Sequence, residues 1–61
     1  MMTSKQCMSF IYSYIEEIDG YDGFEQVIGM IRMARFGGLI SYSENKELRA
    51  AAHRKLHEVI E

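Results

Sequence analysis

The stretch TSKQCMSFIYSYIEEI, residues 3–18, decides the fold because it has the period of a single amphipathic helix. At 100° per residue its apolar side chains fall within one arc of roughly 200°, and polar side chains fill the remainder. An arc of about 100° suffices for a helix packed against one neighbour. We therefore expect this helix to contact two other helices or another chain. The apolar set is Cys7, Met8, Phe10, Ile11, Tyr12, Tyr14, Ile15 and Ile18.

Helix caps indicate where three helices begin. A polar residue followed three positions later by Glu or Gln is typical of a helix N-terminus, since each side chain can bond the other residue's backbone N–H. Glycines able to end a helix follow the first two segments, at Gly20 and at Gly37 with Gly38. The caps are Thr3 with Gln6, Asp22 with Glu25, and Ser41 with Glu44, with Ser43 as an alternative third cap. These signals predict helices at about residues 4–19, 23–36 and 43–60.

The second and third segments carry narrower apolar faces, as in the helices of a small bundle. In the second segment the face is Phe24, Val27, Ile28, Ile31 and Ala34, with Met30 at its edge. In the third segment it is Leu48, Ala52, Leu56 and Val59, with Ala51 and Ile60 beside them. Proline is absent, and in no segment do apolar and polar residues alternate with the period of two that is typical of a strand. The sequence predicts an all-α, three-helix domain over residues 1–61.

The small size of the chain limits the stability of its own core. A domain of 61 residues buries only about 60% of the surface that its unfolded chain exposes. Such a core rarely supplies more than ~3–5 kcal/mol unaided, and one cysteine excludes an internal disulfide. Association with a second copy or another protein is the most available source of further stability.

The composition also argues against several partner classes. A net charge of −2 gives no general attraction to nucleic acid or anionic lipid. No apolar run approaches the ~18 residues of a membrane span, and a single thiol is typical of a reducing compartment. We expect a cytoplasmic protein with no membrane partner.

No residue pattern indicates catalysis. His53 and His57 can share one helix face, but a zinc site needs at least one further protein ligand. Arg54 stands where the metalloprotease motif HExxH has its Glu. Cys7 lies in the apolar arc and is expected in the core. We predict that the protein is not an enzyme and has no catalytic, metal or cofactor site and no small-molecule substrate.

Aromatic and Met side chains are the candidates for partner binding. Phe10 and Tyr12 lie at the two rims of the wide arc, and Met33 and Phe36 lie opposite the core face of the second helix. Interface centres favour such residues, and Met adapts to irregular surfaces. We predict an interaction module that forms a homodimer or docks on a cellular protein. The candidate contact residues are Phe10, Tyr12, Tyr14, Met30, Met33 and Phe36.

A nucleic-acid-binding regulator is the alternative function. Basic side chains of the third helix could follow a phosphate backbone, and the preceding joint resembles the turn before a recognition helix. Four glutamates on the same helix oppose this function. Arg32 and Arg35 are interpreted only as charges that suit a helix C-terminus. The candidate nucleic-acid residues are Lys46, Arg49, His53 and Arg54.

The general character of the chain resembles a class of phage proteins. The chain is short, lacks proline and catalytic motifs, has one cysteine, and carries the paired caps Thr3/Gln6, Asp22/Glu25 and Ser41/Glu44. In these respects it resembles the small helical accessory proteins of bacteriophages, such as those of the exo–xis region of lambdoid phages. The resemblance transfers no functional residue. It implies an adaptor that redirects a host process by binding a host protein.

Overall fold

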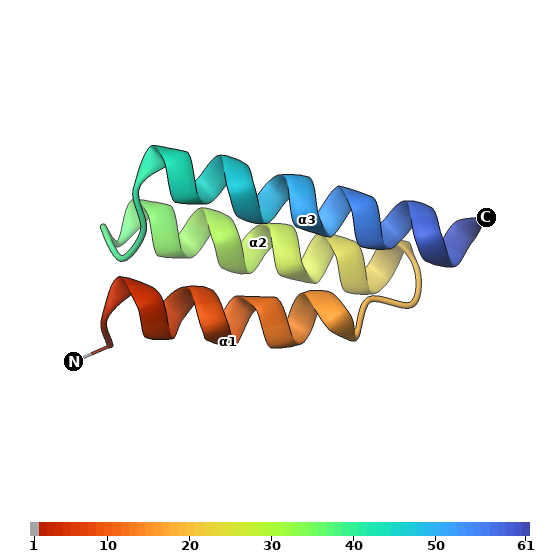
Figure 1. Ribbon diagram of the computed structural model, residues 1–61, viewed down its shortest axis with the longest axis horizontal. Coiled ribbons are helices and arrows are strands. Elements are labelled where there is room, and N and C mark those ends of the chain that lie inside the picture. Colours follow the sequence, from red (N-terminus) through yellow and green to blue (C-terminus); the bar gives the residue numbers. More distant parts are fainter. Residues whose placement is uncertain (1) are drawn as a thin grey trace.

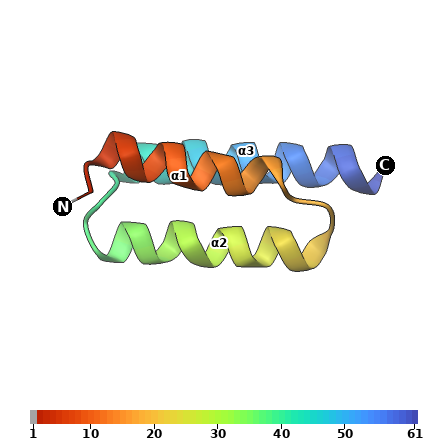
Figure 2. The same ribbon diagram turned by 90° about the horizontal axis from the view of Figure 1, so that it is seen from below.

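The computed structural model describes residues 2–61 and contains three helices joined by two short turns. They are α1 (Ser4–Glu16), α2 (Tyr21–Phe36) and α3 (Tyr42–Ile60). The helices run alternately up and down, so α1 and α3 are parallel and α2 is antiparallel to both (Figure 1). Every pair of helices is in contact. In Figure 2, α1 and α3 lie at the same level and α2 lies below them, so the bundle has a triangular cross-section. The predicted all-α, three-helix fold is confirmed.

The capping boxes predicted at Thr3 and Ser41 are both present. Ser41 Oγ accepts the Glu44 N–H at 3.1 Å, while Glu44 Oε1 accepts the Ser41 N–H at 2.7 Å. Thr3 and Gln6 make the equivalent bonds at 3.1 and 2.9 Å. Because α3 begins at Tyr42, Ser41 rather than Ser43 is its cap.

The predicted end of α1 near residue 19 is wrong, because the helix closes at Glu16. Its last turn tightens into bonds between residues three apart, in which Glu17 N–H donates to the Tyr14 carbonyl at 3.1 Å. Such bonds satisfy terminal carbonyls that the helix would otherwise leave unpaired. Ile18 is still buried, at 2% exposed, but it reaches the core from the turn. Gly20 has extended backbone (φ 172°) and does not act as the predicted C-cap.

The predicted cap formed by Asp22 and Glu25 is also wrong, since α2 begins at Tyr21 with Gly20 as N-cap. The Phe24 N–H donates to the Gly20 carbonyl at 3.1 Å, which sets the first turn two residues earlier than expected. Glycine is tolerated at this position although it offers no side-chain bond. Asp22 instead lies in the first turn, where the helix N-terminus favours a negative charge.

The joint between α2 and α3 closes as a Schellman motif. Leu39 N–H donates to the Ala34 carbonyl at 2.9 Å, and Gly38 N–H donates to the Arg35 carbonyl at 3.1 Å. Gly38 has φ 74°, a left-handed conformation that side chains other than glycine's disfavour. The motif confirms the predicted helix stop and directs Ile40 into the core, where it is 3% exposed.

One apolar cluster holds the three helices together, and no polar or charged side chain among residues 2–61 is buried. Val59, a predicted member of the apolar face of α3, and Ile60, predicted beside that face, are instead 38% and 45% exposed. They belong to the end of α3, which extends beyond the α1–α2 turn (Figure 1). No helix within residues 2–61 is long and apolar enough to cross a membrane. The cluster consists of Cys7, Ile11, Ile15, Ile18, Val27, Ile31, Ala34, Ile40, Leu48, Ala51, Ala52 and Leu56.

Candidate interaction surface on α1 and α2

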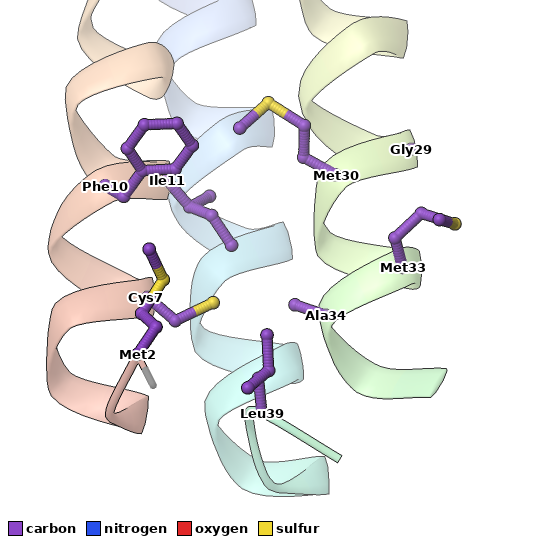
Figure 3. Close-up of a pocket in the computed structure, with 9 residues that line it drawn as sticks. All are labelled: Met2, Cys7, Phe10, Ile11, Gly29, Met30, Met33, Ala34 and Leu39. Carbon is purple, nitrogen blue, oxygen red and sulfur yellow. The ribbon is translucent and has the colours of Figure 1, made fainter. Parts of the chain in front are cut away.

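An apolar groove of about 620 Å³ runs between the N-terminal half of α1 and the C-terminal half of α2 (Figure 3). None of its side chains is charged. We call it the α1–α2 groove, and its lining residues are Met2, Cys7, Phe10, Ile11, Gly29, Met30, Met33, Ala34 and Leu39.

The floor and the edges of the α1–α2 groove differ in exposure. Side chains directed between the two helices, such as Ile11 and Ala34, belong to the buried core (Figure 3). Phe10 on the α1 edge is 48% exposed, and Met33 on the outer side of α2 is 73% exposed. Met30 is half-buried between them. The groove is thus an extension of the core that residues 2–61 leave open to solvent.

The two rims of the α1 arc have different environments. Phe10 and Tyr14 stay exposed and pack edge-on, with ring centroids 5.1 Å apart. Tyr12 lies on the α3 side, where its hydroxyl donates a hydrogen bond to Glu47 Oε2 at 2.8 Å. Of the candidate residues on α1, Phe10 therefore lines the groove, Tyr14 lies beside it, and Tyr12 joins α1 to α3.

The bond to Glu47 also affects the acidity of Tyr12. It raises the pKa of the Tyr12 phenol above its usual value, because the hydrogen bond to the carboxylate stabilises the protonated form of the phenol. Partial burial and the charge of Glu47 raise this pKa further, whereas the charge of Arg54 lowers it.

Phe36 lies outside the α1–α2 groove and is 83% exposed. Together with three arginines it lines a second, shallow depression of about 160 Å³ between the end of α2 and the start of α3. Sequence reasoning missed Arg32 and Arg35. The signal was that Arg32 lies four residues before Phe36 and three before Arg35, which are the spacings of neighbours on a helix surface. We call this depression the arginine groove, and it consists of Arg32, Arg35, Phe36, Asn45 and Arg49.

The basic residues predicted on α3 do not form one face. Arg49 lines the arginine groove, and the ring of His53 packs edge-on against Phe24 of α2 at 4.9 Å. Lys46 Nζ lies 5.7 Å from the centre of the Tyr42 ring. Arg54 instead lies near Tyr12 of α1, where its charge lowers the pKa of the phenol. The four predicted nucleic-acid residues are therefore divided between two sides of the helix.

The polar residues that could support other chemistry are dispersed. His57 Nδ1 lies 4.0 Å from Glu61 on the exposed face of α3. Within residues 2–61, no three His, Cys, Asp or Glu side chains converge on a point where they could hold a metal ion. Cys7 is 4% exposed in the core, as its position in the arc predicted.

Charges on α1, α2 and their turn are segregated along the bundle. Lys5 lies at the start of α1, and Arg32 and Arg35 lie near the end of α2, so all three are at the end of the bundle that holds the α1–α2 groove. We call this end the basic end. Charges on α3 and the residue that follows it, residues 42–61, cancel, with four acidic and four basic residues. No Lys or Arg in the described part of the chain lies within 4.0 Å of a carboxylate oxygen. The end of α1, the α1–α2 turn and the start of α2 form the opposite, acidic end, which carries Glu16, Glu17, Asp19, Asp22 and Glu25.

Comparison of the chain with protein-family models, with curated proteins and with solved structures found no match. Its function is therefore inferred from its own surface.

Proposed function

We propose that the chain is a non-enzymatic protein-interaction module that binds through the α1–α2 groove and its edges. The observation that carries this proposal is the apolar groove itself, with Phe10 and Met33 exposed along it. Complete burial of a side chain such as Met or Phe contributes roughly 1.5–3 kcal/mol. Phe10 and Met33 are partly buried already, so a partner that covers both edges would gain part of this amount from each side chain.

The chemistry of the α1–α2 groove favours a protein as its partner. A surface that offers no charge and almost no hydrogen-bonding side chain can select a partner only by shape and apolar contact. Flexible Met side chains adapt to such contacts. A second copy and a cellular protein both fit this description. If the phage resemblance holds, the cellular protein belongs to the host.

Site-specific photocrosslinking in the cell of origin tests this function. A photoreactive phenylalanine at position 33 should form adducts with a protein, whereas the same group at position 60 should not. Both positions are exposed, at 73% and 45%, so the comparison controls for nonspecific reactivity. Equal adducts from both positions, or none from position 33, would overturn the proposal.

The arginine groove favours a second candidate function, the binding of nucleic acid. Three guanidinium groups line one depression beside an exposed aromatic ring, and this combination suits phosphate contact and base stacking. Binding to single-stranded RNA and DNA should fall steeply with salt and be abolished by Arg49→Glu. Arg54→Glu makes the same charge change outside the depression and should bind as wild type. Absence of binding at low salt would eliminate this function.

A further inference from the structure

We propose that the partner of the α1–α2 groove is a second copy of this chain, in a two-fold symmetric dimer whose α2 helices cross antiparallel at Gly29. The inference rests on the proposed function and specifies the occupant of the same surface. Three features support it. No internal contact requires the glycine at position 29, this glycine lies at the middle of α2, and the charges of the first two helices are segregated between the ends of the bundle.

No contact within a single chain requires a glycine at position 29. It is exposed in the middle of α2, and a Cβ added there would meet no atom within 4 Å. Glycine weakens a helix interior relative to alanine, so the chain gives up helix stability here without any internal steric need. Glycine in such a position allows another backbone to approach closely.

The surroundings of Gly29 fit a crossing helix. Gly29 lines the α1–α2 groove on one side and, on the other, a depression of about 300 Å³ that includes Phe24 and Ile28. It is therefore the low point of the α2 surface between two depressions that hold apolar side chains. A helix laid across Gly29 can insert side chains into both depressions while the two backbones approach each other.

The distribution of charge favours a second copy of this chain as the source of the crossing helix. A symmetric antiparallel arrangement places the basic end of each copy on the acidic end of the other, whereas a parallel arrangement would bring like charges together. A two-fold interface uses the same patch on both subunits, and therefore needs a patch that is complementary to itself. The surface of α2 around Gly29 satisfies this condition, because Glu25 and Arg32 line the depression beside Gly29 and lie on either side of the helix midpoint.

Because Gly29 lies at the middle of α2, an antiparallel crossing there lets the two α2 helices overlap over their full length. α2 extends over Tyr21–Phe36, so its midpoint lies between residues 28 and 29. A two-fold axis at this midpoint, beside Gly29, sets Arg32 and Arg35 of one copy level with Glu25 and Asp22 of the other. The exposed Met33 lies about one helical turn from the axis and becomes buried.

The surface of the molecule is large enough for this interface. Stable complexes bury about 800 Å² per partner, which is roughly a fifth of the 4386 Å² surface of the chain. The long sides of the bundle, 36 Å by 15–18 Å between Cα atoms, have about this area once side chains are included. One face, rather than the whole surface, is sufficient.

Sedimentation of the full chain between about 1 µM and 1 mM tests the dimer. The wild type should dimerise within this range. Gly29→Gln should weaken the dimer at least tenfold while raising the thermal midpoint measured at the lowest concentration. Ala50→Gln, on the exposed face of α3, is the matched control and should dimerise as wild type. A wild type that stays monomeric throughout, or a Gly29→Gln variant with wild-type affinity, overturns the proposal.

A charge exchange separates a second copy from any other partner. Arg32→Glu should weaken the dimer about tenfold, and adding Glu25→Arg should restore it because the exchange recreates both symmetric contacts. Failure of this rescue overturns the antiparallel register. If the chain stays monomeric but position 33 still crosslinks to another protein, the dimer fails and the proposed function stands. If both measurements are negative, both fail.

Discussion

Gly29 and Gly38 should respond in opposite ways to the same substitution. Neither has an atom within 4 Å of an added Cβ, but Gly38 alone has a positive φ, of 74°. Gly38→Ala should therefore lower the free energy of unfolding by about 1–2 kcal/mol. Gly29→Ala should raise it by about 0.5–1 kcal/mol at concentrations where the chain is monomeric. Urea denaturation at low micromolar concentration measures both changes, and changes of the same sign would contradict the assignment.

The hydrogen bond between Tyr12 and Glu47 predicts a pH dependence in the alkaline range. The Tyr12 phenol ionises near pH 10 in the unfolded chain but at higher pH in the folded protein, where the bond to Glu47 raises its pKa. The stabilisation is therefore complete below about pH 10 and is lost as the pH rises through the folded-state pKa.

Tyr12→Phe tests this linkage. The substitution should lower the free energy of unfolding by about 0.5–1.5 kcal/mol at neutral pH and flatten its decline above about pH 10, as followed by urea denaturation. The control is Tyr14→Phe, which removes a phenol that makes no hydrogen bond within residues 2–61. Parallel pH profiles for wild type and Tyr12→Phe would exclude the linkage.

At the scale of the element, Ser41 and Ser43 differ in their contribution to the start of α3. Ser41 exchanges two hydrogen bonds with Glu44, whereas Ser43 lies inside the first turn. Ser41→Ala should lower the free energy of unfolding by about 1 kcal/mol, and Ser43→Ala should change it by no more than about 0.5 kcal/mol. Thermal denaturation followed by circular dichroism measures both, and a larger loss from Ser43→Ala would refute the cap.

The helix ends show which features the sequence can predict. The boxes at Thr3 and Ser41 depend on atoms three residues apart, so the local pattern is sufficient to identify them. The turn between α1 and α2 is different, because Ile18 is buried although it lies outside the helix, so its apolar character does not require α1 to continue to it. Its conformation depends on how the two helices pack, and the pattern formed by Asp22 and Glu25 therefore gave a false start.

The candidate surface is predictable to a similar extent. Helical periodicity alone places Met33 and Phe36 away from the core, and both are exposed. Periodicity gives no spacing between helices, so it could not show that α1 and α2 leave a groove. It likewise could not show that Arg49 of α3 joins the arginines of α2, since that neighbourhood exists only after the helices pack.

At the scale of the whole molecule, one small core carries the stability of all three helices. Leu48 of α3 is 0% exposed within it, and truncation of a buried leucine to alanine costs about 2–5 kcal/mol. This range is comparable to the ~3–5 kcal/mol that a core of this size supplies. Leu48→Ala should therefore leave the chain largely unfolded at 25 °C by circular dichroism. Ile60→Ala, at the exposed end of α3, is the control, and a cooperative melt retained by Leu48→Ala would contradict this prediction.

The separation of charge in the first two helices makes the molecule an electric dipole along its 36 Å axis. A dipole in the field of another charged body experiences a torque, so its orientation is biased before contact. At physiological ionic strength this field decays over about 8 Å, whereas at 0.01 M salt it extends about 30 Å, close to the length of the bundle. In dilute salt near neutral pH, the chain should consequently adhere by opposite ends to anion- and cation-exchange surfaces.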